Sequence, residues 1–262
     1  MKAIVKVVAV MTASTLLATM LNAQSKPATP KHRPITSSQA KDPKAAETPE
    51  QKPVFENEKI KVFRYELAPG VTVSTGEHAT DHLLIPIGDV TVAVEARQRV
   101  RARSGEVQIL KRGGKESVTN TGTSQAIAID VEILGGLGFD DVICGINGVR
   151  CEDTLLGGDL RGGSWGINTL AKTGIVAIAI TEIDPGIATD PLPRKAPELR
   201  VWVSGGQVAE QSEDSEGKTP DPAAGKLVEN APGDVAWLPA GAAIVMKNIG
   251  AAQVKMVTVS FL

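Results

Sequence analysis

The stretch Gly233–Asn248, with the sequence GDVAWLPAGAAIVMKN, decides the fold of this chain. In it a short apolar run follows a glycine, a Pro-x-Gly turn follows the run, and a second apolar segment ends at an Asn-x-Gly turn. The stretch Gly105–Asn120, with the sequence GEVQILKRGGKESVTN, repeats the glycine, the run, a turn at Gly113 and the Asn-x-Gly turn. Short runs between turn residues predict β-strands, and their recurrence predicts an internal repeat.

A second pair of matching segments supports this repeat. Leu67–Gly70 closes a strand pattern in the first half, and Ile183–Gly186 does the same in the second half. The spacing from these segments to the next repeated block differs between the halves, and one insertion explains the difference. We assign it to Gln211–Gly225, which is polar, acidic and contains proline, and predict an exposed loop there.

The composition of the chain is also that of a β protein. Its 262 residues include 26 glycines, and aromatic residues make up only 3%. Apolar and polar residues alternate from Phe63 to Leu67, and a denser apolar run covers Ala126–Ile133. A period of two residues in short segments predicts an all-β sandwich or barrel.

The repeated segments resemble the two motifs of the cupin family, commonly written G-x5-H-x-H-x3-4-E-x6-G and G-x5-P-x-G-x2-H-x3-N. Four residues fall at the spacing of the second motif: Gly233, Pro239, Gly241 and Asn248. Ile244 takes the place of its histidine. The resemblance covers about residues 54–135 and 174–262. It implies an all-β chain with two double-stranded β-helix barrels of the jelly-roll type in tandem.

The chain therefore divides into five parts. We predict a signal peptide, a disordered linker, a first barrel, a glycine-rich interdomain segment with at most one short strand, and a second barrel. Their ranges, in that order, are 1–23, 24–52, 53–135, 136–173 and 174–262. The linker is rich in proline, lysine and small residues, and it lacks the large apolar side chains that a core needs.

The N-terminus has the features of a signal peptide. Lys2 and Lys6 precede an apolar run, Val7–Leu21, and Leu21-Asn22-Ala23 offers a cleavage site. A transmembrane anchor is the alternative, but the run is shorter than the ~20 apolar residues that span a bilayer and is interrupted by polar residues. We therefore predict a periplasmic or secreted protein that has no transmembrane anchor once the signal peptide is removed.

The two cysteines, Cys144 and Cys151, are separated by a short loop that contains glycines. In an oxidising compartment such a pair can close a disulfide. Two free thiols are the alternative. Because export and the short separation both favour the bond, we expect a disulfide between Cys144 and Cys151.

The resemblance also points to a candidate metal site in the first half. When Gly70 sets the register, the first histidine position of the family falls on Gly76 and the second falls on His78. The glutamate position falls on His82, and the histidine position of the second motif falls on Glu116. One ligand is therefore kept, two are exchanged in type, and the one at Gly76 is lost.

Strand geometry allows these residues to meet. His78 and His82 are four residues apart, so their side chains point to the same face of a strand, and Glu116 on a neighbouring strand would oppose them. Two histidines and one carboxylate form a ligand set used for Fe(II), and the set also suits Zn or Mn. The sequence thus predicts a divalent metal cofactor, Fe, Mn or Zn. The alternative is that no metal binds, with His82 at a strand end and Glu116 facing solvent.

The second half lacks an equivalent set. Its histidine positions hold Leu192, Arg194 and Ile244. Only Glu198 occupies the glutamate position, and one carboxylate cannot hold a metal alone. We expect Arg194 or Arg200 to pair with Glu198 and this barrel to be structural. A small-ligand site at Glu198 and Arg194 is the alternative.

Basic residues gather in the first half, partly in alternation with apolar ones. They are Arg97, Arg99, Arg101, Arg103, Lys111, Arg112 and Lys115. We expect a solvated strand face, with anion binding or contact with a membrane surface as the alternatives.

Two classes of function follow from these features. The first is a metal-dependent oxygenase or isomerase of a small molecule, in which the metal acts as a Lewis acid or activates oxygen. The second is a non-catalytic periplasmic bicupin that binds a small ligand or has a structural role. The formal net charge of -2 argues against a nucleic-acid partner. No feature of the sequence indicates an oligomeric state.

Overall fold

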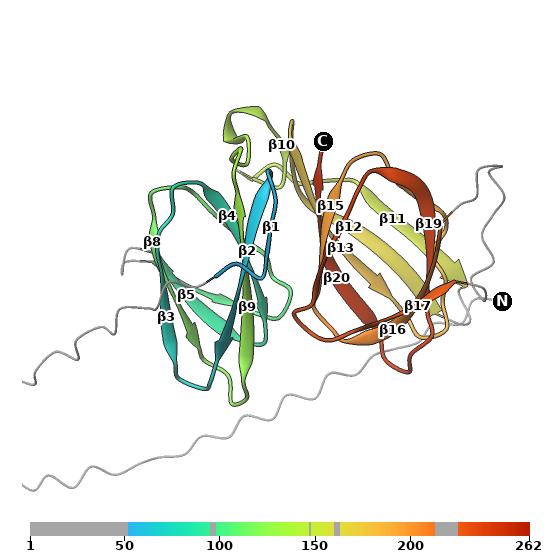
Figure 1. The fold of residues 1–262 in the computed structure, drawn as a ribbon, viewed down its shortest axis with the longest axis horizontal. Coiled ribbons are helices and arrows are strands. Elements are labelled where there is room, and N and C mark those ends of the chain that lie inside the picture. The colour runs from blue at the N-terminus through green and yellow to red at the C-terminus, as the bar shows by residue number, and fades with distance from the viewer. Residues whose placement is uncertain (1–51, 95–97, 147, 160–162, 213–224) are drawn as a thin grey trace, which may run out of the picture. The chain divides into compact units, whose positions relative to one another are not determined.

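The fold is given by a computed structural model, and it consists almost entirely of antiparallel β-strands (Figure 1). The structure describes residues 52–94, 98–146, 148–159, 163–212 and 225–262. The predicted signal peptide, nearly all of the predicted linker and most of the predicted loop Gln211–Gly225 lie outside these ranges. Within the described ranges, no helix has the length and apolar character needed to cross a membrane.

The first barrel is built from two sheets, coloured blue to green in Figure 1. The first sheet has the order β1 (Phe55–Glu56), β2 (Ile60–Leu67), β9 (Ala126–Ile133), β4 (Asp81–Ile87) and β7 (Gln108–Leu110). The second sheet has the order β3 (Thr72–Glu77), β8 (Lys115–Asn120), β5 (Val90–Val94) and β6 (Gln98–Ala102). Every pairing in both sheets is antiparallel.

The second barrel follows the same plan with additional strands at one edge. Its larger sheet has the order β10 (Val142–Cys144), β12 (Gly163–Thr173), β13 (Val176–Ile183), β20 (Val254–Phe261), β15 (Glu198–Trp202) and β18 (Val235–Leu238), with β11 (Thr154–Asp159) beside β12. Its smaller sheet has the order β14 (Leu192–Arg194), β19 (Gly241–Asn248), β16 (Gly206–Ser212) and β17 (Lys226–Asn230). A short 3₁₀ helix, Phe139–Asp141, precedes β10. The predicted all-β fold with two jelly-roll barrels is confirmed.

The motif asparagines of the two halves occupy equivalent positions. The side-chain amide of Asn120 donates hydrogen bonds to the carbonyl oxygens of Leu67 and Ser124, and its oxygen accepts one from the Gly122 N–H. Asn248 makes the corresponding three bonds, to Ile183, Ala252 and Gly250 in the second barrel. Each buried asparagine therefore joins the end of one strand to the turn that begins the last strand of its barrel.

The glycine that opens each repeated stretch lies where the two barrels meet. Gly105 and Gly233 have φ values of 81° and 87°, a left-handed conformation that favours glycine. A Cβ at Gly233 would overlap the guanidinium of Arg64 in the first barrel. A Cβ at Gly105 would come within 3.2 Å of Val203 in the second barrel. Each barrel thus presents its motif glycine to the other, in an approximately reciprocal arrangement.

The largest hydrophobic cluster also lies between the barrels. It joins one face of β2, β4 and β9 to one face of β13, β15 and β20. On β4, Leu83 and Ile85 face this cluster, whereas Leu84 belongs to the core inside the first barrel. Alternation then directs His82 to the inside as well. Both faces of β4 are buried, which is why its sequence, DHLLIPI, shows no polar alternation.

The segment 136–173 contains more β-structure than the sequence predicted. In place of at most one short strand it carries β10, β11 and the 11-residue β12, which pairs with β13. The second barrel therefore begins well before residue 174. The glycines of this segment, and a register shift between Thr169 and Ala171, interrupt the two-residue period by which strands are recognised.

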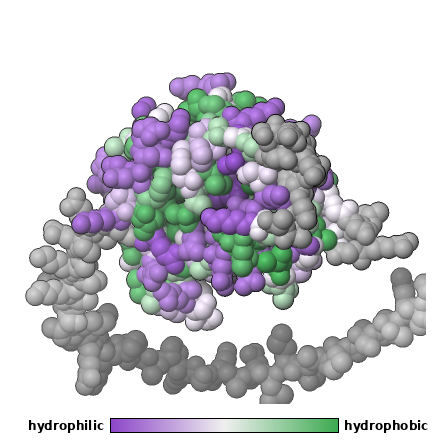
Figure 2. Space-filling view, turned by 45° about the vertical axis from the view of Figure 1, so that its right-hand side comes forward, coloured by the Kyte–Doolittle hydropathy of each residue, from purple (hydrophilic) through white to green (hydrophobic). Residues whose placement is uncertain are grey.

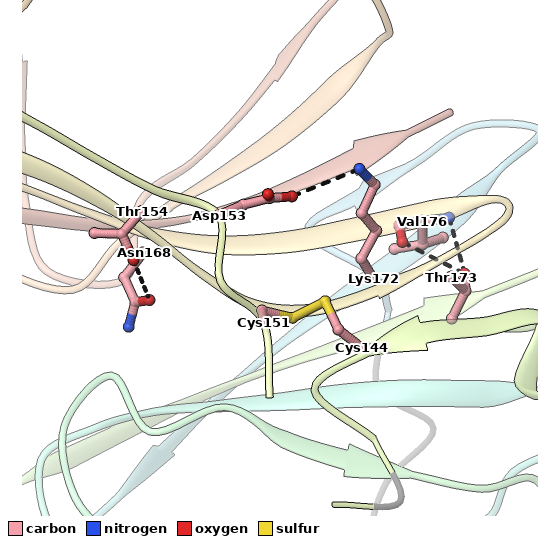
Figure 3. The surroundings of a disulfide bond; sticks show 8 residues. All are labelled: Cys144, Cys151, Asp153, Thr154, Asn168, Lys172, Thr173 and Val176. Carbon is pink, nitrogen blue, oxygen red and sulfur yellow. Dashed lines mark hydrogen bonds and ion pairs between the residues drawn. A yellow bond between two sulfur atoms is a disulfide. The ribbon is translucent and has the colours of Figure 1, made fainter. Parts of the chain in front are cut away.

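A disulfide joins Cys144 on β10 to Cys151, which shortly precedes β11 (Figure 3). Beside it, Lys172 Nζ on β12 lies 3.7 Å from Asp153 Oδ2. Both β10 and β11 pair with β12, so the bridge closes a loop whose two ends are held by the same strand. This part of the connection is thus fastened to the larger sheet of the second barrel.

Apolar side chains on the outside are dispersed. Leu155 and Leu156 on the edge strand β11 are 55% and 77% exposed. On the face of the molecule in Figure 2, hydrophobic residues lie in several separate groups among hydrophilic ones. Scattered apolar residues of this kind need no partner to explain them.

Replacement of Asn248 by alanine is expected to lower the free energy of unfolding by roughly 2–3 kcal/mol, because it leaves two carbonyl groups and one N–H without their partner. Urea denaturation of the intact chain measures the change. Asn168→Ala, at an exposed position on β12, is the control and should have little effect. Equal losses in the two variants would contradict the structural role of Asn248.

Candidate metal centre

The structure brings His78, His82 and Glu116 together inside the first barrel. His78 lies in the turn between β3 and β4, His82 on β4 and Glu116 on β8. Only 5%, 0% and 2% of these residues, respectively, is exposed. One potential ligand atom of each residue lies within 4.8 Å of those of the other two, so the group could hold a metal ion. The alternative in which Glu116 faces solvent is wrong.

The Nε2 atoms of both imidazoles face the Glu116 carboxylate. Glu116 Oε2 lies 3.9 Å from His78 Nε2 and 3.5 Å from His82 Nε2. The two rings stack with their centroids 3.7 Å apart. Among the described residues, neither Nε2 atom has a hydrogen-bond partner, although both are buried. Buried ring nitrogens normally have a partner, and two that converge on a carboxylate are suited to donate electron pairs to one cation.

Two further carboxylates contact the rings at Nδ1, and Asp130 Oδ2 also lies 3.7 Å from His78 Nε2. His78 Nδ1 lies 3.0 Å from Glu132 Oε1, and His82 Nδ1 lies 2.7 Å from Asp130 Oδ1. When each Nδ1–H donates to its carboxylate, the lone pair of each Nε2 is left facing Glu116. Carboxylate–histidine pairs of this kind orient the histidines that bind metals in proteins.

The register of β4 and β9 produces these pairs. His82 lies opposite Glu132, and Leu84 lies opposite Asp130. Asp130 and Glu132 are two residues apart on β9, so both side chains point to the same face, towards the histidines. The two acids that complete the site therefore come from the strand that forms the centre of the first sheet.

A tight turn between β7 and β8 encloses the site from another side. The Gly113 N–H donates a hydrogen bond to the His78 carbonyl oxygen at 2.9 Å. At Gly114, a Cβ would overlap Glu116 Oε1. The absence of a side chain at this position lets the turn approach the carboxylate.

The carboxylates make the interior of the barrel favour positive charge. Burial opposes a charged imidazole and lowers the pKa of His82, but the hydrogen bond to Asp130 and the charges of the nearby carboxylates outweigh it, so the pKa is raised. The pKa of Tyr65 on β2 is also raised, first by burial and then by Asp130 and Glu132, so its hydroxyl stays protonated. Both directions are those expected beside concentrated negative charge.

A divalent cation fits these donors. Two imidazole nitrogens and one carboxylate are a ligand set of non-haem Fe(II), and the same donors bind Mn(II) and Zn(II). The cation would offset the charge of the carboxylates, and three protein ligands leave coordination positions for a small molecule.

Asp130 and Glu132 were not predicted from the sequence. They lie in the run Ala126–Ile133, whose sequence AIAIDVEI was interpreted as an apolar strand. The sequence did contain this information. Two acids that are two residues apart in an otherwise apolar strand point to the same buried face. A buried carboxylate needs a partner, so their presence in such a strand indicates a polar or cation-binding interior.

A pocket of about 440 Å³ borders Glu116 between the turn after β7 and strands β5 and β6. Its lining includes the apolar residues Val92, Val100 and Leu110, and the exposed residues Lys111 and Arg112 mark its mouth. The volume lies within the range of small-molecule sites. A small ligand in this pocket would therefore lie beside Glu116.

The second barrel holds an ion-pair cluster in place of metal ligands. Arg200 on β15 is 4% exposed and lies 2.8 Å from both Glu198 Oε1 and Glu210 Oε1. Within the part of the chain that the structure describes, only the His78, His82 and Glu116 group could hold a metal ion. Arg200 thus supplies the positive charge that the carboxylates of this barrel need.

Arg194 lies at the edge of the second barrel and contacts backbone. Its guanidinium donates hydrogen bonds to the carbonyl oxygens of Ala242 and Pro239, at 3.2 and 3.1 Å. Glu198 pairs with Arg200 rather than with Arg194. The two residues that defined the alternative small-ligand site therefore each have a partner within the protein.

The substitutions Asp130→Asn and Glu132→Gln are each expected to weaken metal binding by about 10–100-fold, because the imidazoles lose the carboxylates that fix their orientation and tautomer. Isothermal titration with Mn(II) or Zn(II) measures the affinity. Glu229→Gln, which changes an exposed carboxylate on β17, is the control. The role of these acids is disproved when all three variants bind metal as the unaltered chain does.

Arg200→Met should lower the free energy of unfolding by about 3–5 kcal/mol, because it leaves two carboxylates in the second barrel without their cation. Replacing Glu198, Arg200 and Glu210 together by methionine should recover most of that loss. Denaturant titration of the two variants tests this, and a triple variant less stable than the single one would contradict it.

Comparisons with known proteins concern the fold. No protein-family model matches the chain, and no curated protein matches its sequence. A protein from Pseudomonas aeruginosa that is named as glyoxylate-induced matches with a TM-score of 0.54 and 14% identity, over 78% of this chain and 75% of that chain. AerE from Microcystis aeruginosa matches with a TM-score of 0.51 and 12% identity, over 81% and 97% of the two chains.

A mutant of the oxalate decarboxylase OxdC from Bacillus subtilis also matches. Its TM-score is 0.51 and its identity 15%, over 78% of this chain and 69% of that chain. Similarities at such low identity establish architecture and leave function open. The chain has the cupin fold, in the form of two barrels in tandem.

Proposed function

We propose that the first barrel binds one divalent metal ion through His78, His82 and Glu116 and uses it to transform a small molecule. The observation that carries the proposal is the pair of buried Nε2 atoms that converge on Glu116 while their Nδ1 atoms are held by carboxylates. The pocket that reaches Glu116 supports access for a substrate. An oxygenase or an isomerase is the class of reaction that such a site serves.

Each residue of the site would have a distinct role. His78 and His82 bind through Nε2, and Glu116 binds through its carboxylate. Asp130 and Glu132 keep a proton on each Nδ1 and so hold both rings in place. When bound, the metal supplies Lewis acidity or the activation of oxygen. The apolar wall of the barrel keeps bulk water from the centre, which strengthens every charge interaction there.

Mn(II) is the first metal to test. The oxalate decarboxylase from Bacillus subtilis, which is similar in fold, is described with Mn(II) centres. The Glu116 carboxylate also offers the type of oxygen ligand that suits Mn(II). Fe(II) and Zn(II) remain candidates because imidazole binds them as well.

The second candidate is a non-catalytic bicupin with a structural role. The ion-pair cluster of the second barrel favours such a role for that barrel, because Arg200 fills an interior that would otherwise be open to a metal or ligand. We further propose that the protein acts in the periplasm or outside the cell. The predicted signal peptide and the disulfide between Cys144 and Cys151 support this location, since disulfides persist in oxidising compartments.

Metal analysis of the purified protein tests the proposal. We expect about one metal ion per chain, lost in His78→Ala and in His82→Ala, because each variant removes one of three ligands. His32→Ala is a matched control, since His32 is the third histidine of the chain and lies outside the described residues. Circular dichroism confirms that each variant is folded. Absence of stoichiometric metal, or its retention in both site variants, would falsify the proposal.

A further inference from the structure

We infer that the pocket over Glu116 selects a small carboxylate with a short apolar chain. The inference rests on the proposed function and specifies its substrate class. Three features of the pocket support it. They are the apolar wall, the two cationic residues at the mouth, and the hydrogen bonds that hold the backbone of these two residues.

The wall defines the apolar part of the ligand. Val92 belongs to the core of the first barrel, and Leu110 packs against that core. Together with Val100 they line the pocket between its mouth and Glu116. Its volume of about 440 Å³ accommodates only a small molecule. A ligand that fills it therefore places a short hydrocarbon segment along these residues.

The charge of the mouth defines the polar part. Apart from Glu116, the charged residues of the lining are Lys111 and Arg112. Among the residues that the structure describes, the Arg112 guanidinium has no ion-pair partner, whereas Arg101 is paired with Asp89 at 2.9 Å. Lys111 also lines the pocket, and its Nζ lies 4.7 Å from the centre of the Phe139 ring, a contact that leaves its positive charge unneutralised. Guanidinium and ammonium groups in this setting favour a carboxylate.

The turn that carries both cations is fixed to the metal ligands. The Arg112 N–H donates a hydrogen bond to Asp81 Oδ1 at 3.1 Å, and Asp81 directly precedes His82. The other oxygen, Asp81 Oδ2, accepts a bond from the Leu137 N–H at 2.9 Å. Next along the turn, Gly113 bonds to the carbonyl oxygen of His78. The backbone of the cation pair thus keeps a constant position relative to the imidazoles, as a preorganised binding site requires.

The charges of the site are consistent with an anion. The charged residues that line the pocket are Glu116, Lys111 and Arg112, and their formal charges sum to +1. A divalent metal bound to Glu116 would add further positive charge there. An ammonium ligand would meet two like charges on entering, and a neutral ligand would gain nothing from them.

Butyrate, its neutral amide butyramide and butylamine provide a test with the Mn(II)-loaded full chain. Isothermal titration measures binding, and the EPR spectrum of Mn(II) reports a ligand near the metal. We expect butyrate to bind at least tenfold more tightly than butyramide and butylamine. Arg112→Gln should reduce the affinity for butyrate about tenfold, the effect of losing one charge-assisted contact, while Mn(II) binding is unchanged. Arg101→Gln, at an ion-paired arginine of the same barrel that does not line the pocket, should change neither.

The outcomes separate this inference from the proposed function. Failure to bind Mn(II), Fe(II) or Zn(II) defeats the proposed function and the inference with it. Stoichiometric metal with butyrate no tighter than butyramide defeats the inference alone. Equal loss of butyrate binding in Arg112→Gln and Arg101→Gln would also overturn it, because the effect would then be one of overall charge.

Discussion

The strands β4 and β9 are the elements on which the rest of the structure depends, because both of their faces are buried. Odd-numbered residues such as Leu83, Ile85 and Val131 pack between the barrels. Even-numbered residues, His82 and Asp130 among them, point into the first barrel. A shift of one residue in the pairing of these strands would exchange the two sets and place ionisable groups in an apolar cluster. The apolar contact between barrels therefore also fixes the register of the candidate metal site.

The two barrels stabilise their buried carboxylates in different ways. Carboxylates inside a barrel need positive charge nearby, since burial without a partner is costly. In the second barrel Arg200 provides it permanently and bonds to both acids. In the first barrel the imidazoles donate hydrogen bonds from Nδ1 to carboxylates and leave their Nε2 atoms without a hydrogen-bond partner. Only the arrangement in the first barrel leaves imidazole nitrogens available to bind a metal ion.

The fold and the three site residues could be predicted from the sequence because both depend on local patterns. Turn residues at fixed spacing revealed the repeat, and the family motif placed His78, His82 and Glu116 at ligand positions. The expected common strand face of His78 and His82 was wrong, because His78 lies in the turn before β4. Asp130 and Glu132 were missed because the apolar residues around them make the whole run resemble an apolar strand. Segment 136–173 was misinterpreted because glycines and a register shift conceal the period of β12. The contact between Arg200 on β15 and Glu210 on β16 joins the two sheets of the second barrel, and such contacts depend on packing that no single segment encodes.

The apolar layer between the barrels has a consequence for how such a chain can change over generations. A second barrel without a candidate metal site would in general be free to be shortened or discarded. Here its sheet covers the outer face of the strand that carries His82, so removal would expose Leu83 and Ile85 to water. The second barrel therefore supplies an apolar surface that the first barrel needs, and selection on the candidate metal site extends to residues of the second barrel that lie outside this site.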